Sequence, residues 1–318
     1  MASIDPRSFP RILRAEGLIP FTGCAILLGF VVTIREAGFS GADWGLFALA
    51  ALAALLIHVD GHLWNDIMDL ETDRHEKSKE TGRDRPLVFG WATVEEYKKI
   101  SAGVIVLVVV LAAYLTTQRL LMPFMLAIGL FFDYGYNHPR IALAYRPFTE
   151  YYLFPWLVVG VTVTVVYAAT GFFSVLAVIL SLLHGLTATC FVVSMMRRDS
   201  VSDRLGGKRT SSVLYPGLPH STIYGIVTLF VAVLMWYPLV RVLGNTGLAT
   251  LLIFTTAMVA VINTGIGIRI DRLCTRAMTS FFPEFEARAN RLMLQQVGAC
   301  LVHAVAVSFV LLVAGGMA

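Results

Sequence analysis

Charged residues are scarce in this sequence. Asp, Glu, Lys and Arg make up 14% of its 318 residues and hydrophobic residues make up 57%, whereas roughly a quarter of an average soluble domain is charged. This composition excludes an ordinary soluble protein and predicts an integral membrane protein. The net charge of +4 needs no nucleic-acid partner, because membrane proteins gather Lys and Arg in their cytoplasmic loops.

Motifs built on cysteine and histidine are also missing. His58-x-x-x-His62 is the single histidine pair at helical spacing, whereas a metal-dependent desaturase or hydroxylase needs several. Asp60-Gly61 is not followed by the Ala-Arg that a CDP-alcohol phosphotransferase requires. No C-x-x-C pair occurs among the cysteines, so their spacing indicates neither a disulfide nor a thiolate metal site; they are Cys24, Cys190, Cys274 and Cys300.

Long apolar runs are what the sequence does contain. A transmembrane helix needs about 20 mainly apolar residues. Nine segments satisfy this requirement, at about residues 17–35, 45–64, 100–117, 120–136, 152–170, 172–195, 221–241, 247–268 and 295–315. We therefore expect an all-α membrane bundle of about nine transmembrane helices in one domain, residues 1–318. Thr93-Val94-Glu95-Glu96 predicts a capping box before the third span.

The basic residues predict how this bundle is oriented. All but Arg35, Arg119 and Arg241 fall in the N-terminal segment or in the long connections after spans two, four, six and eight. Because Lys and Arg mark cytoplasmic loops, we expect the N-terminus and these connections in the cytoplasm and the C-terminus on the opposite face. In a prokaryote this would be the plasma membrane.

Two of the long connections carry the same acidic pattern. Asp69 and Asp73 follow the second span and Asp199 and Asp203 follow the sixth, each as D-x-x-x-D. Residues four apart share a helix face, where like charges repel, so each pair predicts a bound cation. Oxygen ligands without a thiol favour Mg²⁺, which completes its shell with substrate phosphates. A transporter is the main non-enzyme alternative, but these carboxylates lie at one face and not near mid-span.

Basic residues follow both acidic pairs and suit a phosphate ligand; they are Arg83, Arg85, Lys208 and Arg209. One D-x-x-x-D could be an ordinary solvated loop. Two copies at equivalent span ends, each with basic residues behind it, favour a functional site that holds a diphosphate between them.

These stretches resemble the UbiA superfamily of intramembrane prenyltransferases. The first has the pattern N-D-x-x-D-x-x-x-D and then R-P-L-x-x-G, with Asn65, Asp66, Asp69, Asp73, Arg85, Pro86, Leu87 and Gly90. The second has the pattern D-x-x-x-D-x-x-x-G-[KR]-[KR]-T, with Asp199, Asp203, Gly207, Lys208, Arg209 and Thr210. A Tyr-rich segment between them resembles the family's segment after the fourth helix, with Tyr134, Tyr136, Arg140, Arg146 and Glu150.

The resemblance implies a bundle around a lipid-accessible cavity, capped by cytoplasmic loops, in which Mg²⁺ and a prenyl diphosphate bind. The implied metal ligands are Asn65, Asp66, Asp69, Asp73, Asp199 and Asp203. The implied diphosphate ligands are Asn65, Arg83, Arg85, Arg146, Lys208 and Arg209. Besides the four motif aspartates, Tyr136 is the expected catalytic residue, because an aromatic face stabilises an allylic cation.

The acceptor is less defined than the donor. The family's usual reaction transfers the prenyl group to a lipophilic, often aromatic, acceptor. Quinone-forming relatives often carry Asn just before the second motif, where this chain reads "SMMRRD" at residues 194–199. A terpene cyclase of the same fold, which needs no acceptor, therefore remains the alternative reaction.

Overall fold

The described part of the chain is helical. A computed structural model describes residues 14–74, 85–138, 140–279 and 284–315, and these ranges contain helices and turns but no β-strand. Within these ranges, eight segments are long and apolar enough to cross a membrane, namely Ile19–Ala37, Trp44–Met68, Val94–Gln118, Thr149–Thr170, Val175–Arg198, His220–Leu243, Thr246–Ala277 and Ala287–Ala314. The predicted multi-pass helical fold is confirmed.

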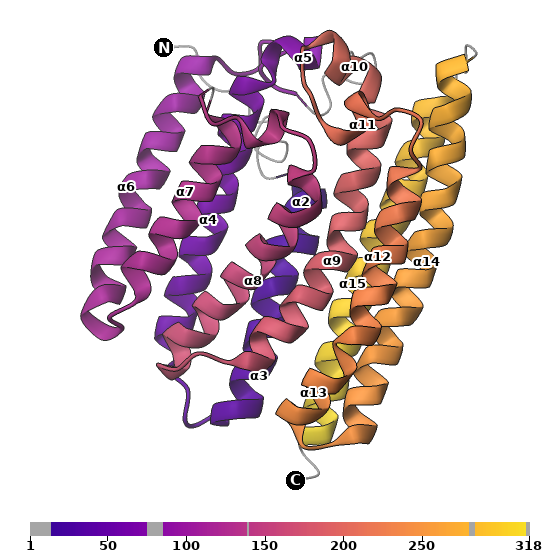
Figure 1. Ribbon diagram of the computed structural model, residues 1–318. Coiled ribbons are helices and arrows are strands. Elements are labelled where there is room, and N and C mark those ends of the chain that lie inside the picture. The colour runs from indigo at the N-terminus through magenta and orange to yellow at the C-terminus, as the bar shows by residue number, and fades with distance from the viewer. Residues whose placement is uncertain (1–13, 75–84, 139, 280–283, 316–318) are drawn as a thin grey trace.

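Most of these segments are single helices in Figure 1. They are η2 with α3 (Ile19–Gly23 and Cys24–Ala37), α4 (Trp44–Met68), α6 (Val94–Gln118), α8 (Thr149–Thr170), α9 (Val175–Arg198), α12 with α13 (His220–Leu234 and Trp236–Leu243), α14 (Thr246–Thr279) and α15 (Phe285–Gly315). A short helix, α2 (Ala15–Leu18), precedes η2.

The remaining predicted span forms a shorter helix. α7 (Met122–Asn137) has 16 residues and is therefore about 24 Å long, less than the roughly 30 Å of a bilayer's hydrocarbon core. It packs along α4 and α6 (Figure 1). The difference between nine expected spans and eight long helices is this one element.

Both aspartate motifs leave the bundle at the same end, which we call the motif end. There α4 leads into α5 (Leu70–Arg74), α9 leads into α10 (Ser200–Leu205), and α11 (Ser211–Leu214) lies beside them, at the top of Figure 1. The turn after α3 and the end of α15 lie at the bottom. Short helices thus cap the motif end, as expected.

The backbone has the same geometry at both exits. Asp69 ends α4 with φ −86° and ψ 2°, and Asp199 ends α9 with φ −83° and ψ 2°. Each N–H still bonds to a carbonyl four residues earlier, that of Asn65 at 2.8 Å and that of Met195 at 2.9 Å. The first aspartate of each motif is therefore the residue at which a long helix breaks into a short one.

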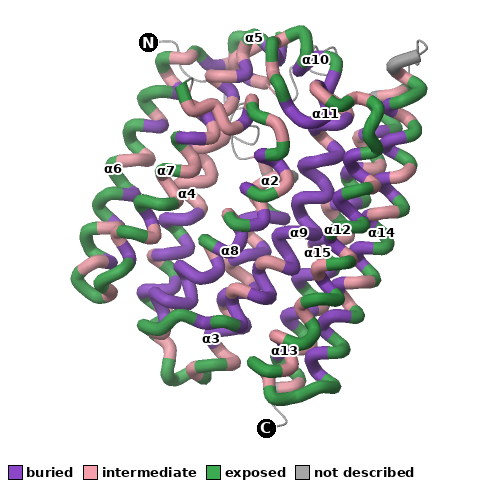
Figure 2. The backbone as a smooth tube through the Cα atoms, in the orientation of Figure 1, coloured by how far each residue is buried: buried purple, intermediate pink, exposed green. Residues whose placement is uncertain are grey.

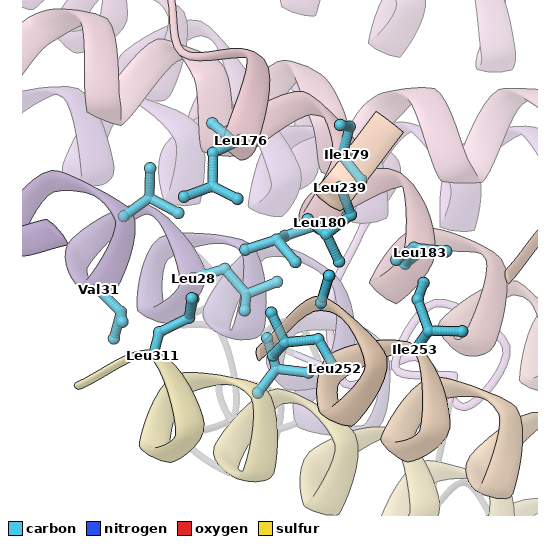
Figure 3. Packing of buried hydrophobic residues seen from close by; sticks show 14 of the residues in the cluster. Leu28, Val31, Leu176, Ile179, Leu180, Leu183, Leu239, Leu252, Ile253 and Leu311 are labelled. Atoms are coloured by element: carbon cyan, nitrogen blue, oxygen red, sulfur yellow. The ribbon is translucent and has the colours of Figure 1, made fainter. Parts of the chain in front are cut away.

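The central helix is α9. In its most apolar 18-residue stretch, 83% of the residues are buried inside the bundle, compared with 22% in the corresponding stretch of α6. Figure 2 colours most of α9 as buried. Leu180 and Leu183 of α9 belong to one packed cluster with Leu28 of α3 and Leu252 of α14 (Figure 3). Lipid is as apolar as leucine, so such packing is what holds membrane helices together. The burial of α9 fixes the position of the second motif.

Helices α8 and α9 approach closely at Gly185. A Cβ atom added there would lie 2.8 Å from the backbone of Pro155 on α8, which only a glycine avoids. At the start of α6 the predicted capping box is also confirmed, because Glu96 N donates to Thr93 Oγ1 at 3.2 Å and Thr93 N donates to Glu96 Oε2 at 2.8 Å.

We predict that the motif end faces the cytoplasm. The four native cysteines are buried, so single cysteines at exposed positions report the topology. Phe39 lies in the turn after α3 and is 67% exposed, and the Glu71 side chain on α5 is 76% exposed. A membrane-impermeant maleimide should label F39C but not E71C in intact cells, and both after permeabilisation. The reverse pattern would contradict the predicted orientation.

Candidate active site

The first aspartate motif is a buried cluster at the end of α4. Asp66, Asp69 and Asp73 are between 2% and 4% exposed. Arg85, in the turn before α6, pairs with Asp73 and places its Nη1 3.5 Å from Asp66 Oδ1. Arg14, just before α2, pairs with the same Asp66. Three buried carboxylates are thus matched by two guanidinium groups.

Asn65 connects these groups. Its Nδ2 donates to Asp69 Oδ2 at 3.0 Å, and its Oδ1 accepts from Arg14 Nη1 at 3.0 Å. Because Asn65 and Asp69 lie four residues apart, one turn of α4 presents both to the same point. The predicted residues of the first motif therefore lie together.

The second motif lies at the end of α9. Asp203 is 5% exposed, and Asp199 pairs with its neighbour Arg198, whose Nη1 also donates to Asn290 Oδ1 of α15 at 2.5 Å. After α10 the chain reverses at Gly207, whose φ of +78° favours glycine. This turn directs Lys208 back, with its N–H donating to the Asp203 carbonyl at 2.8 Å.

Lys208 joins the two motifs. Its Nζ lies 2.8 Å from Asp69 Oδ2 and 3.5 Å from Asp203 Oδ1. The same ammonium lies 5.2 Å from the centre of the Tyr145 ring, and the Tyr145 hydroxyl reaches Asp69 Oδ1 at 3.0 Å. One lysine, an aspartate from each motif and a tyrosine from the connecting segment thus meet at one point.

The charges of this group follow from its surroundings. Burial raises the pKa of Asp69, but the positive charges of Lys208 and Arg85 outweigh it and hold that pKa below the usual value. Burial opposes the charge of Lys208, and the two carboxylates raise its pKa well above the usual value. Burial and the neighbouring Asp69 raise the pKa of Tyr145 to about 12. At neutral pH the site holds carboxylate, ammonium and neutral phenol.

The Tyr-rich segment lies across the two motifs. Tyr136 on α7 packs edge-on against Phe154 of α8, with ring centroids 5.7 Å apart. Glu150 is buried at the start of α8, and its Oε1 accepts from the N–H of Ser211 in α11 at 3.3 Å. The segment therefore ties the region after the second motif to α7 and α8.

Other predicted diphosphate ligands lie apart from this group. Arg146 and Arg209 are exposed, although the Arg209 N–H donates to the Tyr145 carbonyl at 3.2 Å. Arg83 lies outside the described residues. For these three, as for Asn65, Arg85 and Lys208, the role as diphosphate ligands stays a prediction.

Arg14, Tyr145 and Asn290 were not predicted as site residues. Tyr145 lies within the Tyr-rich segment that includes Tyr134 and Glu150, so its place in the sequence could have indicated a role in the site. Arg14 and Asn290 stand 52 and 91 residues from the aspartates that they approach or support, and no local pattern marks them. They come to the site through the packing of α2 and α15.

The chemistry of the site fits a hard divalent cation. Within the described ranges no three His, Cys, Asp or Glu side chains converge on one point as a preformed metal cage, because basic side chains stand between the carboxylates. The donors are nevertheless all oxygen and belong to both motifs. Asp66 Oδ2 is buried without a hydrogen-bond partner, which is an orphaned acceptor suited to a metal ion.

A sequence model of a protein family matches most of this chain. The model of the UbiA prenyltransferase family matches residues 25–282. This chain belongs to the UbiA prenyltransferase family. The match contains both aspartate motifs and the Tyr-rich segment, whereas Arg14 and α15 lie outside it. A search of curated protein sequences finds no significant match.

Solved structures of UbiA proteins share the fold. A UbiA homolog from Archaeoglobus fulgidus bound to GPP and Mg²⁺ is 15% identical, with a TM-score of 0.60 over 93% of this chain and 98% of that one. An apo UbiA homolog from Aeropyrum pernix K1 is 20% identical, with a TM-score of 0.61 over 90% and 96%. A structure of digeranylgeranylglyceryl phosphate synthase is 17% identical, with a TM-score of 0.55 over 93% and 98%.

The contact between α5 and α10 generates a prediction for this UbiA site. A Cβ atom on Gly206 would lie 2.2 Å from Thr72 Oγ1 and 2.7 Å from Thr72 Cβ. G206A should therefore push the two motifs apart, destabilise the protein by about 1–3 kcal/mol and lower activity about tenfold or more. Thermal unfolding and turnover of a prenyl diphosphate measure both effects.

The matched control is G217A, since a Cβ atom on Gly217 meets nothing within 4 Å. Adding Thr72→Gly to G206A removes the overlapping atoms and should restore part of the activity. Normal activity and stability in G206A would show that the spacing of α5 and α10 is unimportant.

Proposed function

We propose that this protein catalyses the Mg²⁺-dependent transfer of a prenyl group from a polyprenyl diphosphate to a lipophilic acceptor, with an aromatic acceptor favoured. The observation that carries the proposal is the position of Lys208 between Asp69 and Asp203. It brings two D-x-x-x-D motifs from distant parts of the chain to one buried point. Such an arrangement suits a ligand that is anionic and metal-bound.

Mg²⁺ would be held by the oxygen donors Asn65, Asp66, Asp69, Asp73, Asp199 and Asp203. When bound it supplies Lewis-acid neutralisation of the departing diphosphate. Lys208 and Arg85 would bind diphosphate oxygens, with Arg83, Arg146 and Arg209 approaching from the loops. Tyr145 holds Asp69 through its hydroxyl.

The allylic C–O bond would ionise at the polar end of a membrane-embedded prenyl chain. Tyr136 belongs to the Tyr-rich segment and packs against Phe154, and its ring would stabilise the allylic cation. The surrounding helices keep water from the cation, which would otherwise be captured as an alcohol. An acceptor dissolved in the lipid would then take the prenyl group and lose a proton.

Relatives of the same fold support the donor. The Archaeoglobus fulgidus homolog was solved with GPP and Mg²⁺ and also with DMAPP and Mg²⁺. Under the proposed orientation the diphosphate and Mg²⁺ enter from the cytoplasm, and the prenyl chain and acceptor enter from the bilayer.

The motif aspartates should be essential. Replacing Asp69, Asp73, Asp199 or Asp203 by Ala should each lower activity on the order of 10²-fold or more, as expected for the loss of preorganised electrostatic stabilisation. Prenyl diphosphate turnover at varied Mg²⁺ measures this effect. E71A is the matched control, because Glu71 lies on α5 together with Asp73 but its side chain is exposed. Normal turnover in all four aspartate variants would refute the metal site.

Product analysis distinguishes transfer from cyclisation. With donor and Mg²⁺ alone, a transferase should release diphosphate slowly and yield at most prenyl alcohol, because no nucleophile captures the cation. The correct acceptor should accelerate diphosphate release and give an adduct heavier by the prenyl mass. Mass spectrometry of a panel of prenyl diphosphates, with and without a lipid extract, provides the measurement.

A cyclic hydrocarbon or cyclic alcohol formed from the donor alone at a comparable rate would establish the terpene cyclase instead. The specific observation that favours testing this alternative is Arg198. It occupies the position before Asp199, where quinone-forming relatives often carry Asn, and it pairs with that aspartate.

A further inference from the structure

A second basic site lies away from the aspartate motifs. A cavity of about 590 Å³, largely open to its surroundings, is lined by side chains of α14 and α15. The ends of these two helices at the motif end lie at the upper right of Figure 1. Among the described residues, none from the aspartate motifs lines the cavity. Arginines from both helices line it, namely Arg269, Arg272 and Arg276 of α14 and Arg288 and Arg291 of α15.

The arginines face one another. Positions 269, 272 and 276 share one face of α14, and positions 288 and 291 share one face of α15, so like charges are neighbours along each helix and across the cavity. Glu284 pairs with Arg288 at 2.7 Å, but both side chains are at least half exposed, which weakens the pair. An anion bound by Arg269, Arg272 and Arg291 would relieve the repulsion among these three arginines.

The nearest acidic residue on α14 points elsewhere. Asp271 is 5% exposed and accepts from the N–H of Thr222 at 2.9 Å and from its hydroxyl at 2.7 Å, at the start of α12. It also lies 3.7 Å from the buried Arg197 of α9. Asp271 therefore belongs to the packing of α9, α12 and α14 and does not neutralise the cavity.

The depth of the cavity matches a lipid headgroup. From Thr246 to Arg269, α14 rises about 35 Å, slightly more than the roughly 30 Å of hydrocarbon, and Arg272 and Arg276 lie about 5 and 10 Å further along. Leu273 and Leu292 also line the cavity. Cationic and apolar side chains at the edge of the hydrocarbon suit an amphiphile better than a soluble anion.

We propose that this cavity binds the phosphate headgroup of an anionic phospholipid in the leaflet at the motif end. Guanidinium groups bind phosphate oxygens in bidentate pairs, and basic pockets between transmembrane helices on the cytoplasmic side recognise such headgroups. Topology signals account for arginines on this face, but not for their convergence from two helices on one cavity. The site is independent of the proposed catalytic function.

The test uses the full-length protein in phosphatidylcholine vesicles with trace spin-labelled phosphatidylglycerol or phosphatidylcholine. Electron spin resonance gives the relative affinity of the two lipids for the protein surface. We expect the wild type to prefer phosphatidylglycerol and R272Q/R291Q to lose about 30-fold of that preference, since each arginine near the headgroup contributes about 1 kcal/mol and about 1.4 kcal/mol is a factor of ten. R272K/R291K keeps both charges but not the bidentate pairing, so it should lose less of the preference than R272Q/R291Q.

Two controls separate specific binding from other effects. K98Q/K99Q removes the same charge from exposed positions at the motif end of α6 and should leave the preference unchanged, as should D69A in the first aspartate motif. Unchanged preference in R272Q/R291Q, or an equal loss in K98Q/K99Q, would overturn the site. Displacement of the lipid by inorganic phosphate, but not by chloride of equal ionic strength, would assign the cavity to a soluble phosphate and overturn the lipid assignment.

Discussion

The contact of Lys208 with Asp69 and Asp203 is the interaction on which the site depends. Carboxylates from two distant motifs are buried at one end of the bundle, where their mutual repulsion would separate α5 from α10. The lysine neutralises them from between, and Arg14 and Arg85 do the same around Asp66 and Asp73. Buried ion pairs contribute little net stability, because desolvation offsets attraction. Their value here is geometric, since they hold the oxygens that we propose as Mg²⁺ ligands close together.

The backbone also fixes the positions of the two aspartate motifs. Asp69 and Asp199 break their helices with nearly equal dihedral angles, so each motif begins at the last hydrogen-bonded turn of a long helix. Contacts that tolerate only glycine, Gly185 on Pro155 and Gly206 on Thr72, set the distance between the elements. Packing in the middle of the membrane and charge pairing at its edge therefore act on the same two helix ends.

The sequence predicted these features to different depths. The number of spans followed from the lengths of the apolar runs, and the position of the motifs followed from the distribution of charged residues. Both properties can be read from short stretches of the chain. The ends of the helices did not follow from the sequence in this way. The predicted span ended at residue 268, where the apolar run ends, but α14 continues to Thr279. Arginine is a good helix former, so the helix extends beyond the apolar residues that cross the hydrocarbon. Contacts such as Arg14 with Asp66 and Arg198 with Asn290 span 52 and 92 residues. They depend on packing that no spacing rule encodes.

The same packing gives a physical reason for the "SMMRRD" sequence before the second motif. Arg197 is 1% exposed and turns to Asp271 of α14, whereas Arg198 turns to Asp199 and to Asn290 of α15. These two consecutive arginines thus connect the end of α9 to α14 and α15. One consequence is that Asp199 carries a counter-cation from its own neighbour, while Asp69 and Asp203 share Lys208. Because α14 and α15 also bear the arginine cavity, a lipid bound there would contact the two helices that position the second motif.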